Sequence, residues 1–184
     1  MSKRIAYLAA AAFSAIAITA TVVAPVRAEE KTVMVGGAAM FPSKNIIQNA
    51  VNSKDHTTLV AAVKAAGLVP TLEGKGPFTV FAPTNAAFGK LPAGTVDTLV
   101  KPENKATLTK ILTYHVVPGK LEASDLKDGQ KLKTVEGEEL TVKKSGNSVM
   151  IVDAKGGSST VTIPNVNQSN GVIHVVDTVL MPAS

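Results

Sequence analysis

The sequence predicts an α+β fold, because helical and strand-like patterns fall into two successive halves of the chain. Up to about residue 113, apolar residues recur every three or four positions between capping residues and glycines, which is typical of short amphipathic helices. From residue 116 onwards, the pattern changes to short runs rich in β-branched residues, separated by turns rich in Gly and Asn. No segment repeats, so these patterns predict one copy of a single domain.

The amino-terminal segment has the parts of a secretory signal peptide. Lys3 and Arg4 are basic, residues 5–23 are apolar and rich in Ala, and Ala28 completes a site that a signal peptidase accepts. An uncleaved membrane anchor is the alternative, because the apolar run is nearly long enough to span a bilayer. Ala, Ser and Thr dilute its hydrophobicity, so we expect cleavage after Ala28. The protein would then be secreted or periplasmic, with no membrane span once residues 1–28 are removed.

The composition of residues 29–184 limits the possible functions. These 156 residues suit one domain with its own core, and the absence of Cys excludes disulfides, Fe–S clusters and cysteine zinc sites. Three of the 19 basic residues lie in the leader, so 16 basic and 14 acidic side chains leave a net charge of +2. With no Trp, and Tyr114 as its single Tyr, this region lacks the aromatic platforms and basic face of a nucleic-acid-binding protein.

Local signals predict the elements in chain order. Residues 29–44 contain two adjacent glycines, a proline and few apolar residues, which indicates an extended lead-in. Short helices are expected at residues 45–51, 59–66, 69–73, 84–88, 95–100 and 102–113. Strands are expected at residues 78–82, 116–117, 131–135, 139–143, 149–153, 160–163 and 172–176.

Residues 79–88 join a strand to a helix at a sharp corner. Pro83 ends the strand, because its nitrogen cannot donate a hydrogen bond to a neighbouring strand. Thr84 or Asn85 then caps the helix that follows. We expect a structural role for the residues of this corner, which are Phe81, Pro83, Thr84, Asn85 and Phe88.

The pair Tyr114-His115 lies where the longest predicted helix passes into a strand that Gly119 ends. One interpretation is that Tyr114 and His115 contact a binding partner. The alternative is that His115 bonds a nearby loop and that the Tyr114 hydroxyl finds a partner inside the fold, because buried polar groups are nearly always paired. Tyr114 and His115 are therefore the candidate binding residues, with this structural role as the alternative.

The last apolar segment begins at the turn Asn170-Gly171. In the strand that follows, side chains alternate, and His174 lies between apolar residues that occupy both faces. A strand that is apolar on both faces is covered on both sides. We therefore expect structural roles for Asn170, Gly171 and His174.

Together, the segments Thr79–Phe88, Tyr114–Gly119 and Asn170–Pro182 resemble the two boxes and the central Tyr-His pair of the fasciclin (FAS1) domain family. The sequence of Val35–Pro42 is similar to that of single-domain bacterial secreted members of this family. The resemblance implies a FAS1 domain over residues 45–184, built as a wedge of two β-sheets with a cluster of short helices. It also implies an extracellular or periplasmic protein that mediates adhesion, with a contact surface near Tyr114 and His115.

Chemical signatures of other functions are weak. His56, His115 and His174 have no metal-ligand spacing, so we expect neither a metal site nor a cofactor. The Gly-x-Ser-x-Gly motif is absent, and the Gly74-Lys-Gly76 turn lacks the rest of a phosphate loop. We therefore expect no catalytic residues and a protein that is not an enzyme.

Two functional hypotheses follow. The first is a monomeric, non-catalytic cell-adhesion or surface-interaction module whose partner is a protein or a polysaccharide. The second is a carrier of a small apolar ligand, such as a pigment, a lipid or haem, because several Met residues could line an adaptable pocket. A run of lysines between residues 127 and 144 could contact acidic polysaccharide, or could protect strand edges from pairing.

Overall fold

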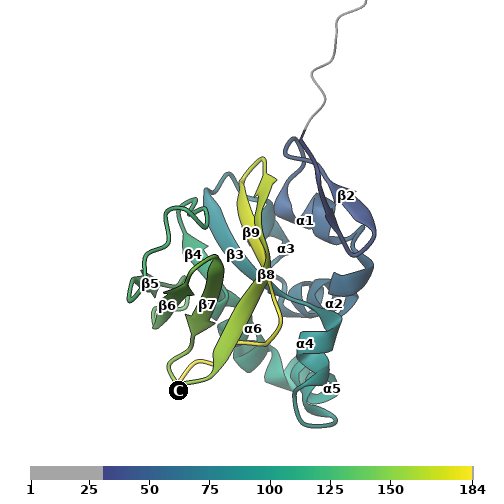
Figure 1. Ribbon diagram of the computed structural model, residues 1–184. Helices are drawn as coiled ribbons and strands as arrows, with labels where there is room; N and C mark the ends of the chain where they lie inside the picture. Colours follow the sequence, from purple (N-terminus) through teal and green to yellow (C-terminus); the bar gives the residue numbers. More distant parts are fainter. Residues whose placement is uncertain (1–30, 184) are drawn as a thin grey trace, which may run out of the picture.

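The computed structural model describes residues 31–183; the predicted leader and its cleavage site lie outside the described residues. The helices are α1 (Ile46–Ala50), α2 (Thr57–Ala66), α3 (Val69–Glu73), α4 (Asn85–Gly89), α5 (Thr95–Leu99) and α6 (Lys105–Tyr114), with 3-10 turns η1 (Lys54–His56) and η2 (Pro102–Asn104). The strands are β1 (Val33–Val35), β2 (Ala38–Met40), β3 (Phe78–Pro83), β4 (Val116–Pro118), β5 (Lys131–Lys133), β6 (Glu139–Ser145), β7 (Ser148–Val152), β8 (Ser158–Gln168) and β9 (Gly171–Val176). Most helices precede most strands, which confirms the α+β class (Figure 1). Between residues 31 and 183, no helix is both long and apolar enough to cross a membrane.

Seven strands form one strongly bent sheet in the order β4-β3-β9-β8-β7-β6-β5. Its neighbours are antiparallel except for β3 and β9, which run parallel. The first residues of β8 pair with β7 and the remainder with β9, so β8 belongs to both halves of the sheet. The N–H of Val135, just after β5, donates to the carbonyl of Val116 in β4 at 2.8 Å, which brings the two outer ends together. The two halves of this single bent sheet, which meet at β8, form the predicted wedge.

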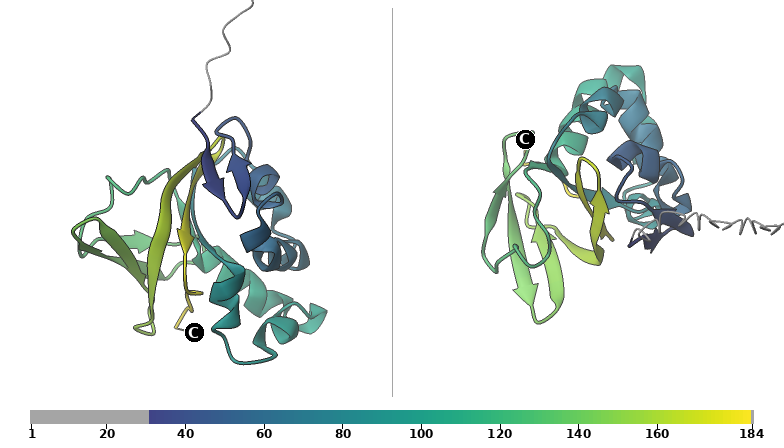
Figure 2. Two further views of the ribbon diagram at one scale, coloured as in Figure 1. Left: turned by 45° about the vertical axis from the view of Figure 1, so that its right-hand side comes forward. Right: turned by 90° about the horizontal axis from the view of Figure 1, so that it is seen from above.

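Two apolar cores lie on opposite sides of β3 and β9. Val80 and Ile173 enter the first core, which is between the sheet and the helices that cover one of its faces (Figure 2). Phe81 and Val176 enter the second core, which fills the inside of the wedge. Side chains alternate between the two cores because successive residues of a strand point to opposite faces. Every residue of β9 is buried, which confirms that this strand is covered on both sides.

The predicted extended lead-in, residues 29–44, contains a hairpin that the sequence pattern does not identify. In this hairpin, strands β1 and β2 pair antiparallel. Its Gly36-Gly37 turn has φ angles of 57° and 77°, which favour glycine at both positions. A Cβ at Gly36 would collide with Ser53 Oγ, so the turn packs closely against the start of η1. Val35 is buried in the first core and ties the hairpin to the domain.

Strand β8 is also longer than predicted. The predicted strand covers residues 160–163, whereas β8 continues past Pro164 to Gln168. The register of the pairing with β9 shifts between Ile163 and Val166, and Asn165 has a φ of 58°. This bulge accommodates Pro164, so β8 continues beyond it.

Candidate functional site

Helix α6 ends at the pair that the sequence marks as the candidate site. Leu108, Ile111 and Leu112 bury one face of this helix in the first core. Tyr114, its last residue, points into the second core and is 0% exposed. His115 follows as the C-cap and is 2% exposed. Both candidate side chains therefore lie inside the fold, in the two residues that precede β4.

The His115 ring joins two distant parts of the backbone. Its Nδ1 lies 2.8 Å from the carbonyl oxygen of Ile111, and the N–H of Leu180 donates to its Nε2 at 2.9 Å. Because Nε2 accepts, the proton of the neutral ring lies on Nδ1, which donates to Ile111. Burial lowers the pKa of His115 to about 4, so the ring is neutral at pH 7. The ring thus fastens the end of α6 to the carboxyl-terminal segment.

The Tyr114 hydroxyl makes a second connection on the other side of the corner. It accepts a hydrogen bond from the N–H of Ala154 at 2.9 Å and donates to the carbonyl of Glu139 at 3.3 Å. Burial raises the pKa of Tyr114, so the hydroxyl keeps the proton that it donates. It therefore holds the β7–β8 turn against the start of β6.

Exposed residues occupy the segments that are hydrogen-bonded to Tyr114 and to the start of β4. Val135 is 46% exposed, and its N–H is bonded to Val116, the first residue of β4. Residues 154–157 form the exposed turn that Tyr114 holds. We call Val135, Gly137 and residues 154–157 the corner surface. The sequence does not single out Val135, because its exposure depends on how the two ends of the sheet meet.

The strand-to-helix corner after β3 is built by two polar residues with different tasks. Thr84 is the N-cap of α4, and its hydroxyl accepts from the N–H of Ala87 at 3.2 Å. Asn85 reaches away from α4: its Oδ1 accepts from the N–H of Thr58 at 3.0 Å, and its Nδ2 donates to the carbonyl of Lys54 at 2.8 Å. Asn85 therefore positions η1 and α2 beside the corner.

The aromatic residues of this corner enter different cores. Phe81 lies inside the wedge, where its ring stacks on that of His174 with centroids 5.6 Å apart. Phe88 is buried among the helices in the first core. Pro83, at the end of β3, lies opposite Val176 of β9. The corner is therefore anchored on both sides of the sheet.

His174 and its neighbours hold the long loop that follows β4. The Nε2 of His174 lies 2.8 Å from the carbonyl of Leu121, and the N–H of Asn165 donates to its Nδ1 at 3.3 Å. Burial lowers the pKa of His174, which is consistent with this neutral form. Thr79 donates through Oγ1 to the carbonyl of Gly119 at 2.6 Å and fixes the start of the same loop.

Asn170 joins three segments that are far apart in the sequence. Its Oδ1 accepts from the N–H of Ile46 at 3.1 Å, and its Nδ2 donates to the carbonyls of Leu72 at 2.7 Å and Gly74 at 2.9 Å. A Cβ at the next residue, Gly171, would collide with the carbonyl oxygen of Phe78. The turn Asn170-Gly171 therefore docks α1 and α3 onto the sheet.

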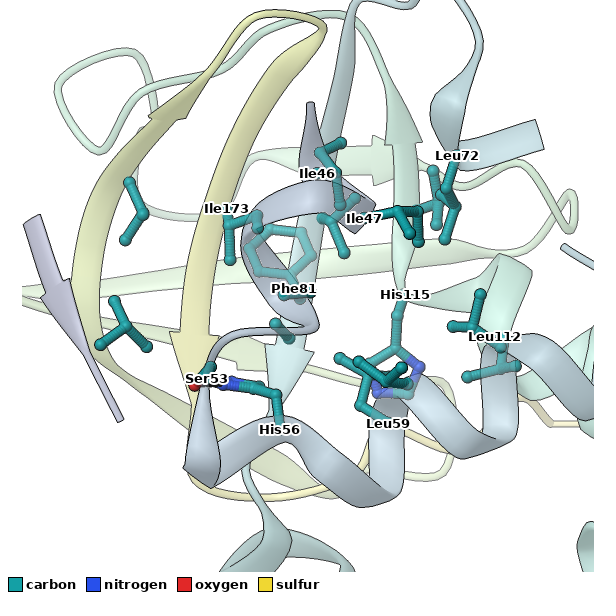
Figure 3. A pocket seen from close by; sticks show the side chains of 18 of the residues that line it. Ile46, Ile47, Ser53, His56, Leu59, Leu72, Phe81, Leu112, His115 and Ile173 are labelled. Atoms are coloured by element: carbon teal, nitrogen blue, oxygen red, sulfur yellow. Dashed lines mark hydrogen bonds between the residues drawn. The ribbon is translucent and has the colours of Figure 1, made fainter. Parts of the chain in front are cut away.

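His56 is the polar side chain whose situation the sequence does not reveal. Its Nδ1 lies 2.8 Å from Ser53 Oγ, whereas its Nε2 is buried and has no hydrogen-bond partner. The ring lines an apolar cavity of about 50 Å³ beneath the helices (Figure 3). Ser and His three residues apart around a 3-10 turn are a local signal for their mutual bond, but not for the unpaired atom.

Neither a metal cluster nor an uninterrupted basic face emerges from residues 31–183. No group of three or more His, Asp or Glu side chains is arranged there to hold a metal ion. Among the lysines of the basic run, Lys131 pairs with Glu139 at 3.3 Å. Lys144 donates through Nζ to the carbonyls of Ala123 and Leu126 at 3.1 and 3.3 Å. Part of this run is therefore engaged in contacts within the domain.

The chain is similar to several bacterial proteins over most of its length. Protein sll1483 of Synechocystis is 45% identical over 181 residues, which cover 98% of this chain and 97% of that protein. Immunogenic protein MPB70 of Mycobacterium bovis is 41% identical over 138 residues, covering 72% of this chain and 66% of that protein. Cell surface glycolipoprotein MPB83 of the same species is 39% identical over 152 residues, covering 80% of this chain and 64% of that protein. The matched region thus spans about two thirds of these mycobacterial relatives.

A similar solved structure and a matching family model point to the same group of proteins as these relatives. The solved structure of a FAS1 domain pair from the insect cell adhesion molecule Fasciclin I superimposes with a TM-score of 0.68 at 19% identity. The superimposed region covers 77% of this chain and 52% of the insect chain. At 19% sequence identity, this similarity shows a shared fold and nothing further. The Fasciclin domain model matches residues 54–182, and this is a family of non-catalytic domain proteins. The resemblance expected from the three sequence segments is confirmed, and the chain belongs to the fasciclin domain family.

Proposed function

We propose that the protein is a secreted or periplasmic, non-catalytic module that attaches to a protein or polysaccharide partner at a surface. One relative is named a cell surface glycolipoprotein, and the protein with the similar fold is named a cell adhesion molecule. Both names support a role outside the cytoplasm. The proposed partner is not a nucleic acid, since the net charge of residues 29–184 is only +2. The module is proposed to act as a monomer.

The corner surface is the proposed contact area. The observation that carries this choice is that Tyr114 and His115 are buried and hydrogen-bonded, while Val135 beside them is 46% exposed. Protein contacts combine an apolar centre with a polar rim, and Val135 with the exposed turns beside it would supply these two parts. The two buried rings would then act indirectly, by holding the loops that a partner touches.

Substitution on the surface tests this proposal without disturbing the core. In Val135→Asp, a charge replaces the apolar centre of the corner surface, and we expect attachment to isolated cell envelopes to fall at least about tenfold. Val51→Asp is the matched control, because Val51 is 49% exposed but lies at the end of α1. Both variants should keep the wild-type melting temperature. Equal attachment of the two variants would exclude the corner surface as the contact.

The carrier hypothesis is less well supported. The cavity beneath the helices encloses about 50 Å³, whereas pockets for drug-sized ligands measure roughly 300–1,000 Å³. A pigment, a full-length lipid or haem would therefore require the helices to separate from the sheet. Native mass spectrometry of the protein purified from its source distinguishes the hypotheses, since a carrier would retain the mass of its ligand.

A further inference from the structure

The segment that follows β9 is buried although it belongs to no strand. Residues 178–183 leave the sheet after β9, and we call them the strap (the last yellow segment in Figure 1). Val179 enters the first core, whereas Leu180 enters the second. Pro182 is buried as well. The strap therefore runs along the boundary between the two cores.

Side chains of distant residues accept hydrogen bonds from the backbone of the strap. The donors are N–H groups and the acceptors lie in other elements: Thr178 donates to Ser159 Oγ at 3.0 Å, Leu180 to His115 Nε2 at 2.9 Å, Met181 to Asp153 Oδ2 at 3.0 Å and Ala183 to Glu138 Oε2 at 2.7 Å. Three of these acceptors are ionisable. The attachment of the strap therefore depends on the protonation of side chains rather than on strand pairing.

We propose that the strap is an acid-sensitive latch, which detaches from the domain as one unit when the His115 ring takes up a proton. The release needs no binding partner. The places that Val179 and Leu180 occupy in the two cores would then open to solvent.

His115 is the acceptor that protonation removes. The neutral ring accepts from Leu180 at Nε2, whereas a protonated ring donates from both nitrogens and would face this N–H with a second donor. A carboxyl group keeps an acceptor oxygen after it is protonated, so Asp153 and Glu138 can still accept. The trigger is therefore the ring and not the two carboxylates.

Burial keeps the ring neutral while the strap is in place. It lowers the pKa of His115 to about 4, and the carbonyl of Ile111 and the charge of Asp153 offset only part of this effect. Once the strap leaves, water reaches Nε2 and the pKa returns towards its ordinary value of about 6.5. Opening therefore takes up a proton, and it becomes more favourable as the pH falls from about 6.5 towards 4.

The ionisable groups around the ring and the strap come from several elements. Asp153 faces both, and Glu138 bonds the end of the strap. Glu136 pairs with Lys110 of α6 at 3.5 Å. On the side of the helices, His56 lines the same cavity as His115, and burial lowers its pKa too. The carboxylates favour a protonated ring once water reaches it, so their charge supports the release.

The strap also bonds both loops of the corner surface. Asp153 directly precedes residues 154–157, and Glu138 directly follows Gly137. Both carboxylates accept from the strap, so its release would loosen the two loops together. Acid would thus weaken the proposed surface contact. This consequence rests on the proposed function, whereas the release of the strap does not.

Amide hydrogen exchange of the folded protein tests the release without a partner. Leu180 and Met181 should share one protection factor, the ratio of intrinsic to measured exchange rate, at least about tenfold below that of the β9 amides. Their exchange should change little in dilute urea, whereas that of β9 should accelerate steeply, because urea dependence scales with the surface exposed. Between pH 7 and 4.5, the protection factor of the strap should fall at least about tenfold.

Two conservative variants assign this pH dependence. His115→Gln offers Leu180 an acceptor that does not titrate, so the protection factor of the strap should fall less than about threefold over the same range. Glu138→Gln keeps both the ring and an acceptor for Ala183, so it should retain the wild-type dependence.

Two results would overturn the proposal. Equal protection and equal urea dependence of the strap and β9 would exclude a separate release. An unchanged pH dependence in His115→Gln would exclude the ring as its trigger. Neither result would bear on the surface contact, which Val135→Asp tests independently.

Discussion

The backbone N–H of Leu180 donates to Nε2 of His115 at 2.9 Å, although the two residues lie 65 positions apart in the sequence. The bond links the end of α6 to the segment that follows β9, and both groups are buried. The other nitrogen of the ring lies 2.8 Å from the carbonyl of Ile111, one turn back in α6. A single neutral imidazole thus completes the hydrogen bonds of two backbone segments that no strand pairing connects.

Replacing this ring should destabilise the domain strongly. In His115→Ala, the N–H of Leu180 loses its partner in a buried position, and the carbonyl of Ile111 loses the donor at its side. We expect the free energy of unfolding to fall by about 3 kcal/mol, measured by urea denaturation. Lys155→Ala, in an exposed turn, is the control and should change it by less than about 0.5 kcal/mol. Similar values for both variants would contradict a structural role for the ring.

The same ring should make stability depend on pH. The pKa of His115 is about 4 in the folded protein and near 6.5 when the chain is unfolded. Between these values the unfolded chain binds a proton that the folded protein excludes, so the free energy of unfolding decreases as the pH falls from 6.5. The loss should total about 3 kcal/mol and level off below pH 4.

Burial also lowers the pKa values of His56 and His174, so their effects add in the same direction. Urea denaturation at a series of pH values would separate the contributions. In His115→Gln, which cannot titrate, the decline between pH 6.5 and 4 should be shallower than in the wild type. If both proteins lost stability at the same rate, His115 would not be the dominant titrating group.

The Tyr114 hydroxyl should contribute less than the His115 ring. Tyr114→Phe keeps the aromatic packing of the second core but removes the bonds to Ala154 and Glu139. Ala154 is exposed, so water can replace one of these bonds, and we expect a loss of about 1–2 kcal/mol. Amide hydrogen exchange should accelerate at Ala154 and in the turn that follows, while β9 stays protected. Unchanged exchange at Ala154 would show that the hydroxyl does not hold this turn.

The sequence predicts the elements that depend on local signals. Pro83 ends β3 and Thr84 caps α4 through contacts within four residues, so both can be read from the chain itself. The hairpin β1–β2 escapes prediction because Val35 is buried in the first core, which forms only when distant segments of the chain come together. The continuation of β8 past Pro164 depends on a bulge that the facing strand accommodates.

The candidate site is predictable to a similar extent. The three segments identify the family and direct attention to Tyr114 and His115, since a polar pair between a helix and a strand needs partners. Those partners are Glu139, Ala154 and Leu180, which only the folded chain brings close. The unpaired Nε2 of His56 is equally invisible in the sequence, because it is defined by the absence of a neighbour in three dimensions.

Asn170 offers the clearest test of how the helices are attached to the sheet. Its side chain bonds the N–H of Ile46 and the carbonyls of Leu72 and Gly74, so Asn170→Ala would leave backbone groups of α1 and α3 without their partners. We expect the free energy of unfolding to decrease by about 3 kcal/mol, because at least two of these groups are buried.

The matched control is Asn52→Ala, since Asn52 is exposed and makes one bond from its Nδ2 to the carbonyl of Gln48 at 2.8 Å. This variant should lose less than about 1 kcal/mol. Hydrogen exchange adds a spatial readout: in Asn170→Ala, the amides of α1 should exchange faster, whereas those of β6 and β7 should not, because these strands lie in the other half of the wedge. Uniform acceleration across the domain would instead indicate that Asn170 stabilises the fold as a whole rather than the attachment of α1 and α3.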